Sequence, residues 1–300
     1  MTNHKHLRQV IEDIYVNNNE LTKDLALRLM NEFRYSKLYI PAKRQNNTLN
    51  FIIYEDNDLK LTPLFTDPVE FDKFFKDKED IKLMQNFFEL YQNILKTTEI
   101  DGYILNPSSE KYLFREEFIL SIKNIPKTNY VSTDTYSIEE LKDFTKSKNE
   151  KLEVFINNKD NIGDFEGLFE VLSQSVLQTL IVSDIDLSDK SREGVINMAE
   201  VSNFTVMYTD NVGGVYATLF SSASKISEVK TDKFKYSQIV NLSMFVNFIL
   251  SEDMDGIILN PEGGDVLIPR SLLLNYSLGF EKFACDERLS DSIYYMFLTE

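Results

Sequence analysis

The chain has 300 residues, with 32 Lys and Arg against 48 Asp and Glu, which gives a net charge of −16. This charge repels nucleic-acid phosphates and anionic lipid head groups, so neither a nucleic acid nor a membrane surface is an expected partner. Hydrophobic residues make up 43% of the chain and include 22 Phe and 15 Tyr, enough to form a buried core. The length favours about two domains.

The compartment predicted from the sequence is the cytoplasm. Cys285 is the single cysteine, so no intramolecular disulfide is possible. Residues 1–10 are polar and lack the apolar segment of a secretory signal. The most apolar stretch, residues 240–250, is interrupted by polar side chains and is far shorter than the ~20 residues that a membrane span requires.

One sequence is present twice. DGYILNP at residues 101–107 returns as DGIILNP at residues 255–261, and the triplet LFT at 64–66 returns as LFS at 219–221. The separation between copies is the same for both motifs to within one residue. We therefore predict a tandem duplication of an alpha/beta unit of roughly a hundred residues, with equivalent hairpins at the two strings.

Periodicity and turn residues predict the elements of the first copy in chain order. Leu25, Leu29 and Phe33 mark a first helix, for which Thr22 is the cap, and a Pro-initiated helix begins after Asp67. Three strands are predicted at 37–41, 50–55 and 60–66, a longer helix at 79–97, and a hairpin of strands 103–105 and 111–114 before a closing helix that ends near residue 123.

The second copy is predicted to repeat this order. Its helices are expected at 164–178, 223–229, 235–251 and 271–276, and its strands at 179–182, 204–208, 215–220, 257–259 and 266–268. A polar excursion at residues 184–200 separates its first two strands, and its Asp184, Asp186 and Asp189 predict a solvated acidic loop.

The predicted fold class is α+β, a tandem duplication of a mixed sheet-plus-helices domain with about five strands and three to four helices per copy. Copy one takes residues 1–123, with its core at 21–123, and copy two takes 164–278. Residues 124–163 form a structured connector, with a short helix after a capping box at Ser137 and Glu140 and an edge strand at 151–156. The apolar tail, 279–300, is expected to pack on the body.

Three motifs of copy one resemble the N-terminal domain of the SseB family, named for enhanced serine sensitivity. They are a strand ending in Pro (KLYIP, 37–41), PLFT at 63–66 and GYILNP at 102–107. Copy two keeps the last motif, keeps the second only as ATLFS at 217–221, and has Ser183 in place of the strand-ending Pro. The resemblance covers about two-thirds of the chain. It implies an α+β domain without an established reaction and therefore brings no catalytic residues.

Four residues are candidates for ligand binding: Asn106, Asn260, Arg115 and Arg270. The two Asn-Pro pairs either present polar loops to a ligand or simply form turns, and the turn interpretation is favoured. The two arginines follow the returning strand of each copy at nearly the repeat spacing. They either bind a carboxylate partner or pair with a local Glu, and the local pair is favoured in so acidic a chain.

A calcium loop is the best metal motif, with Asp253, Asp255 and Glu262 as its weak candidate ligands. Ser251 occupies its first position and Leu259 its ninth, so two ligands are missing. A strand is predicted where the loop requires a helix. We therefore expect no metal and no cofactor.

No catalytic residue is predicted. The two histidines, His4 and His6, lie in the N-terminal tail, which argues against Ser-His-Asp and Cys-His arrangements. The favoured function is a non-catalytic protein- or peptide-binding or scaffold module with a protein partner. Two alternatives stay open: a carboxylate-based hydrolase, with or without a divalent metal, at the seam between copies, and an acidic immunity or inhibitor protein that binds a basic target.

Strands flanked by amphipathic helices need an apolar inner face. We therefore predict that Phe65, Leu105, Phe220 and Leu259 are buried.

Overall fold

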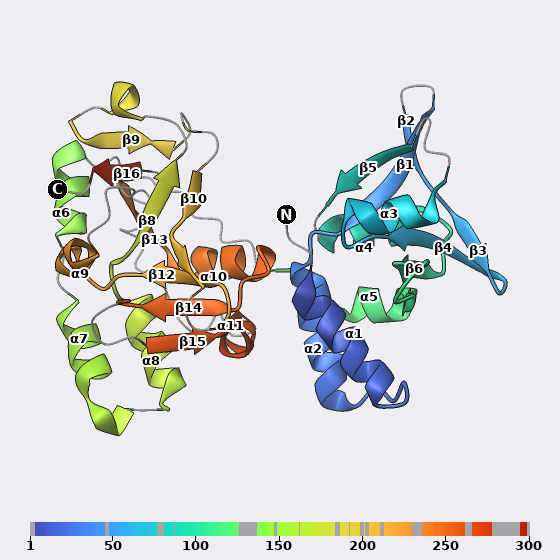
Figure 1. Ribbon diagram of the computed structural model, residues 1–300, viewed down its shortest axis with the longest axis horizontal. Coiled ribbons are helices and arrows are strands. Elements are labelled where there is room, and N and C mark those ends of the chain that lie inside the picture. Colours follow the sequence, from blue (N-terminus) through green and yellow to red (C-terminus); the bar gives the residue numbers. More distant parts are fainter. Residues whose placement is uncertain are drawn as a thin grey trace. The chain divides into compact units, whose positions relative to one another are not determined.

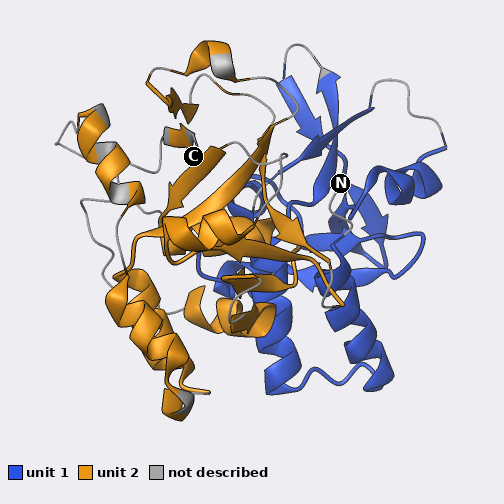
Figure 2. Cartoon of the chain, turned by 60° about the vertical axis from the view of Figure 1, so that its left-hand side comes forward, with its two compact units in different colours: residues 1–126 blue, residues 127–300 orange. Residues whose placement is uncertain are grey.

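The chain divides into two compact units, unit 1 at Met1–Pro126 and unit 2 at Lys127–Glu300 (Figure 2). Among the described residues, no helix combines the length and the apolar character needed to cross a membrane. The computed structural model describes residues 4–45, 48–76, 81–86, 88–125, 137–146, 149–161, 163–183, 187–191, 193–198, 201, 204–210, 213–229, 236–261, 266–277 and 295–298.

Unit 1 contains two sheets and the helices that cover them (Figure 1). Its helices are α1 (Lys5–Val16), α2 (Lys23–Tyr35), α3 (Pro68–Phe74), α4 (Phe88–Thr97) and α5 (Glu116–Ser121). Its strands are β1 (Tyr39–Gln45), β2 (Thr48–Phe51), β3 (Tyr54–Asp56), β4 (Leu59–Leu64), β5 (Ile81–Gln85), β6 (Gly102–Leu105) and β7 (Tyr112–Arg115). The strand orders are β2-β1-β5 and β3-β4-β6-β7, and the pair β4–β6 is parallel.

Unit 2 repeats this plan. Its helices are α6 (Ile138–Thr145), α7 (Glu150–Asn157), α8 (Phe165–Ser173), α9 (Ala223–Glu228), α10 (Leu242–Ser251) and α11 (Arg270–Ser277), with short 3-10 turns η1 (Lys159–Asn161) and η2 (Ser188–Lys190). Its strands are β8 (Leu177–Ser183), β9 (Val195–Asn197), β10 (Phe204–Val206), β11 (Tyr208–Thr209), β12 (Tyr216–Leu219), β13 (Tyr236–Val240), β14 (Gly256–Leu259), β15 (Val266–Pro269) and β16 (Tyr295–Leu298). The strand orders are β10-β8-β13-β16-β9 and β11-β12-β14-β15.

The α+β duplication is confirmed by the topology of the two units. Each has one antiparallel sheet and one sheet with a single parallel pair, β4–β6 in unit 1 and β12–β14 in unit 2. An isolated bridge joins the two sheets at equivalent places, Tyr39 with Phe65 and Gln178 with Phe220. Unit 2 adds α6, β9 and β16 to the shared plan. Strand β16 comes from the predicted apolar tail and lies between β13 and β9.

The long helices predicted at 79–97 and 235–251 are wrong in the same way. In each, the first part is a strand and the helix begins only at Phe88 or Leu242. Strand β5 pairs with β1, and strand β13 pairs with β8. The apolar residues of these segments also fit helical spacing. Strands β1 and β8, however, need a hydrogen-bonding partner at the edge that β5 and β13 occupy, and this tertiary pairing overrides local helix propensity.

Two helices at the starts of the units were not predicted. Helix α1 precedes the expected core of copy one and buries Leu7, Val10, Ile11 and Ile14, a helical pattern within the supposed tail. The edge strand predicted at 151–156 is instead helix α7, where Leu152 is buried and Val154 is 71% exposed. Alternation would place both side chains on one face, so helical spacing decides this segment.

The core residues expected from the repeat are confirmed. Phe65, Leu105, Phe220 and Leu259 are all fully buried. In unit 1 the apolar faces of α1, α2, α4 and α5 join a single cluster, in which the Phe33 ring packs on the rings of Phe88 and Phe114.

Two equivalent glycines explain why the repeated strings begin with Asp-Gly. Gly102 has φ 152° and Gly256 has φ 154°, in a region of conformational space that favours glycine. A Cβ at Gly102 would overlap the carbonyl oxygen of Phe114, and one at Gly256 would overlap that of Ile268. The neighbouring strand therefore approaches the backbone where only glycine fits.

Gly102→Ala and Gly256→Ala should each lower the free energy of unfolding by at least about 2 kcal/mol, because steric overlap adds to backbone strain. Gly213→Ala is the control: φ is 80° there, but apart from its chain neighbours no described atom lies within 4 Å of the added Cβ, so the loss should be about 1 kcal/mol. Chemical denaturation of the three variants measures the difference. Equal losses in all three would refute the close approach.

Phe65→Ala should cost about 3 to 5 kcal/mol in unfolding free energy, since a fully buried ring is replaced by a cavity. Val69→Ala on the neighbouring helix α3 should change it by less than about 0.5 kcal/mol, because Val69 is 62% exposed. A loss below about 1 kcal/mol for Phe65→Ala would show that its ring is not part of the core.

Candidate functional sites

The Asn-Pro turn of unit 1 is a buried connection rather than a free loop. Asn106 is fully buried and has a left-handed backbone, with φ 40°. Its Oδ1 accepts a hydrogen bond from the Thr66 amide at 3.1 Å, and its Nδ2 donates to the Thr66 hydroxyl at 3.1 Å and to the Glu110 carboxylate at 2.8 Å. The carboxamide therefore holds the β6–β7 turn to the start of α3.

Unit 2 makes the same connection. Asn260 has φ 53°, accepts a hydrogen bond from the Ser221 amide at 2.9 Å, and donates to the Ser221 hydroxyl at 2.9 Å. In each unit, therefore, the LFT or LFS triplet is hydrogen-bonded to the repeated DG…NP string. Both asparagines satisfy their polar groups inside the protein, as a structural turn requires.

Helix α1 of unit 1 and helix α7 of unit 2 are bound to this connection at equivalent positions. His4, before α1, contacts the Lys37 carbonyl through Nε2 at 3.1 Å. Asn149, before α7, donates to the Val176 carbonyl at 2.7 Å. Four residues later, Arg8 donates to the Thr66 hydroxyl in unit 1, whereas the Glu153 carboxylate accepts from the Ser221 hydroxyl in unit 2. The two helices are therefore counterparts with opposite charges at the turn.

The charge reversal extends to the next helix. Arg8 lies 2.8 Å from Asp67, 3.0 Å from Glu110 and 3.8 Å from the buried Glu70. Glu70 also pairs with Lys73 of α3. The corresponding pair on α9 is Lys225 with Glu228, in the opposite order. Both turns keep the same framework, but a ligand near them would meet opposite charges.

The two candidate arginines are not equivalent, which corrects the expectation from their spacing. Strand register pairs Gly102 with Arg115 and Gly256 with Pro269, so Arg270 is one position further along. Arg115 is exposed at the end of β7. Arg270 is buried, and its guanidinium donates to the Leu250 carbonyl at 2.9 Å and the Met254 carbonyl at 3.0 Å. Arg270 thus satisfies carbonyls at the end of α10.

The residues of the calcium motif have structural positions. Asp255 accepts a hydrogen bond from the Val215 amide at 2.6 Å, as Asp101 does from Lys60 at 2.7 Å. Asp253 has a left-handed backbone after α10. Strand β14 lies within the motif and strand β15 follows it, where a calcium loop needs a helix, and Glu262 lies outside the described residues. Across the part of the chain that is described, no group of three or more His, Cys, Asp or Glu is placed to hold a metal.

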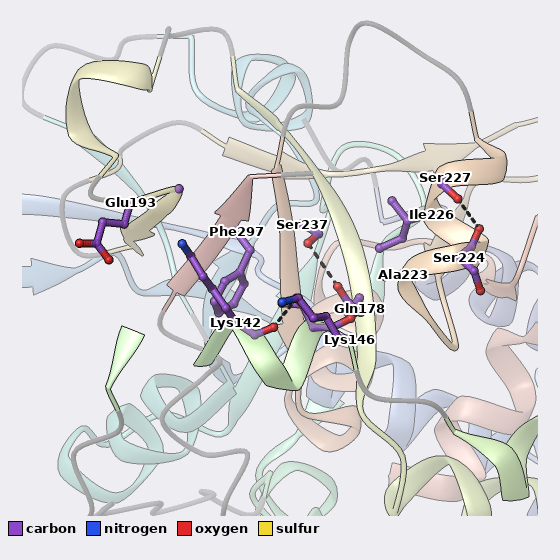
Figure 3. Close-up of a pocket in the computed structure, with 12 residues that line it drawn as sticks. Lys142, Lys146, Gln178, Glu193, Ala223, Ser224, Ile226, Ser227, Ser237 and Phe297 are labelled. Carbon is purple, nitrogen blue, oxygen red and sulfur yellow. Dashed lines mark hydrogen bonds between the residues drawn. The ribbon is translucent and has the colours of Figure 1, made fainter. Parts of the chain in front are cut away.

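Two features of possible ligand contact were missed in the sequence. One is strand β5: among the described strands it is terminal in the sheet order β2-β1-β5, whereas its counterpart β13 is covered by β16. The other is a pocket of about 590 Å³ in unit 2, between α6 and α9 over the sheet that contains β8, β13 and β16 (Figure 3). Both depend on pairings between distant segments, so no local signal identifies them.

No family model matches the chain, and no curated protein or solved structure matches it. The two units are therefore the most informative comparison, because each shows what the other has changed.

The Glu110 carboxylate predicts a pH dependence of stability. Burial alone would raise the pKa of Glu110, but hydrogen bonds from Asn106 and Ser109 and the charge of Arg8 together lower it. A lowered pKa in the folded state means that the ionised group stabilises unit 1 above its ordinary pKa, and that this contribution is lost as the pH falls through the lowered value. Glu110→Gln should therefore reduce the melting temperature at pH 7 and flatten its decline in acid.

Thermal melts between neutral and acid pH measure this, and Glu117→Gln on the exposed face of α5 is the matched control for the loss of one charge. If both variants follow the wild-type profile, the Arg8–Glu110 contact contributes nothing to stability.

Proposed function

We propose that the chain is a non-catalytic peptide-binding module, in which an extended segment of a partner protein adds to the edge strand β5 of unit 1. One observation supports this: the corresponding edge of unit 2 already holds an added strand, β16, antiparallel to β13. Backbone hydrogen bonds at an open edge are the usual source of affinity in strand addition.

The registers of the two sheets identify which groups of β5 are available. The Asn86 amide donates to the Leu38 carbonyl at 3.0 Å, which directs that residue toward β1. Because backbone groups alternate in direction along an antiparallel strand, those of Ile81, Leu83 and Gln85 point away from β1. Leu83 lies opposite Pro41 in unit 1, and its counterpart Ser237 lies opposite Leu180 in unit 2. On its other side, Ser237 pairs with Phe297 of β16. Leu83 is thus at the centre of the proposed contact.

The occupant of the unit 2 edge indicates the kind of segment that β5 would accept. In β16 the side chains of Met296 and Phe297 are both buried. Ile81 and Leu83 are half-buried on β5 and extend the apolar surface. A short apolar strand, flanked by basic residues that suit a chain of net charge −16, is the proposed ligand. An inhibitor of a basic protein would use the same edge.

We also propose that both units are SseB-like domains and that the protein acts in the cytoplasm. What supports the first proposal is the location of the three motifs. KLYIP (37–41) forms the start of β1, although the strand continues to Gln45 and does not end at Pro41 as predicted; PLFT (63–66) joins β4 to α3, and GYILNP (102–107) forms β6 and the turn after it. These are the positions where the two units share their backbone contacts.

Leu83→Pro should abolish peptide binding with little effect on folding, because proline removes a donor that points outward and is tolerated at a sheet edge. Leu83→Ala removes the same side chain but keeps the amide, so it is the matched control. Peptides selected from a random display library against the full chain should bind Leu83→Ala nearly as well as wild type, and Leu83→Pro at least about tenfold more weakly, by fluorescence polarisation.

Amide hydrogen exchange gives a second measurement that does not depend on a variant. A bound peptide should slow exchange at Leu83 in the wild-type chain. Selected peptides that bind both variants equally and leave this amide unprotected would contradict the proposal, as would a library that yields no binder.

A further inference from the structure

We infer that the pocket of unit 2 binds a small phosphate ester with a hydroxyl-bearing body. This inference is independent of peptide binding, since it concerns a different unit and a different surface. The pocket encloses about 590 Å³, within the usual range for small-molecule sites. Its described lining consists of Lys142, Thr145, Lys146, Gln178, Glu193, Gly194, Ala223, Ser224, Ile226, Ser227, Ser237 and Phe297.

The α9 side of the pocket is lined by smaller residues than those of the matching helix α3 in unit 1, where aromatic side chains pack on Phe65. There, the ring of Phe65 packs on Phe71, Phe74 and Phe75, with ring centres 5.6 to 6.1 Å apart. Phe220 of unit 2 is the counterpart of Phe65. Helix α9 follows it as α3 follows Phe65, but bears smaller residues: Ala223, Ser224, Ile226 and Ser227 line the pocket. Around Phe220 the aliphatic side chains of Ile226 and Val229 replace the aromatic ones that surround Phe65.

Two elements that unit 2 adds to the shared plan, α6 and β16, contribute to the wall. Lys142, Thr145 and Lys146 come from α6 or directly follow it, Phe297 comes from β16, and Glu193 and Gly194 lie just before the third added element, β9. Figure 3 shows these residues on one side and the α9 residues on the other, with Gln178 and Ser237 between them. Additions that are separated by more than a hundred residues in sequence therefore converge on one space, which is the arrangement expected of a built site.

The charge of the lining selects an anion. Lys142 and Lys146 both line the pocket of a chain whose net charge is −16. Lys146 forms a 3.8 Å pair with Asp143, and both of these side chains are more than two-thirds exposed, so that pair is weak. Glu193 is the one acidic residue in the described lining, and it lies at the margin in Figure 3. A lysine ammonium is a common phosphate ligand in proteins.

The hydroxyl groups of the pocket lining indicate the chemistry of the part of the ligand that carries the phosphate. Thr145 donates to the Lys142 carbonyl at 2.7 Å, and Ser227 donates to the Ser224 carbonyl at 2.7 Å. Gln178 donates to the Thr145 carbonyl at 2.9 Å and accepts from Ser237 at 3.3 Å. Hydroxyls whose protons are already used still offer lone pairs. They are suited to accept hydrogen bonds from the hydroxyls of a sugar phosphate or a similar ester.

Isothermal titration of the full chain with glucose 6-phosphate, inorganic phosphate, glucose and glucuronate tests the inference. Glucose 6-phosphate should bind most tightly, inorganic phosphate more weakly, and glucose not measurably. Lys142→Gln and Lys146→Gln should each weaken binding about tenfold, as expected for the loss of a hydrogen bond from a charged group. Lys151→Gln, an exposed position on α7, removes the same charge away from the pocket and should have no effect.

Ile226→Phe is the second variant, because it restores a ring where unit 1 has Phe71 and should abolish binding while the melting temperature is kept. The inference is overturned if neither phosphate ligand binds at millimolar concentration, if glucuronate binds as well as glucose 6-phosphate, or if the two pocket lysine variants behave like Lys151→Gln. Binding that survives Ile226→Phe would place the ligand elsewhere and also overturn it.

Discussion

The structure of each unit depends on one buried carboxamide. Asn106 and Asn260 accept a hydrogen bond from the backbone amide of the residue that follows Phe65 or Phe220, and thereby fix the ends of the parallel pairs β4–β6 and β12–β14. That bond positions the start of α3 or α9, and with it either the acidic cluster around Arg8 or one wall of the pocket. Removal of the carboxamide would leave a buried amide without its acceptor, which is costly in a site closed to water.

The parts of the fold that the sequence predicts correctly are those where the backbone permits few residue types. Gly102 and Gly256 occupy a conformation that other residues avoid, and next to them Asp101 and Asp255 bind the amide of a neighbouring strand. Because so few residue types are tolerated at these positions, the same amino acids occur in both copies. The repeat can therefore be recognised in the sequence, and its buried positions can be predicted. The parts that it misses depend on contacts between distant segments. Nothing local in residues 79–97 shows that β1 requires a partner strand, and the apolar residues there fit a helix as well.

The candidate site residues divide in the same way, into those that the sequence predicts and those that it misses. Asn106 and Asn260 were found because they repeat, and repetition reflects their structural role. Arg115 and Arg270 seemed to match because their spacing is one residue from that of the repeat, yet strand register separates an exposed side chain from a buried one that binds the end of α10. The pocket and the open edge lie where the copies differ, in the smaller residues of α9 and in the added strand β16. Positions that differ between the copies belong to no shared motif.

The differences between the units are linked through β16. This strand closes the edge of β13 and also contributes Phe297 to the pocket wall, so unit 2 gains a cavity by the same addition that removes its free edge. Unit 1 shows a different combination, with an uncovered β5 among the described residues and a cluster of Phe rings between β4 and α3. On the two proposals made above, one duplicated framework would support two kinds of recognition. Backbone pairing suits an extended peptide, and a pocket lined by lysines suits a small anion.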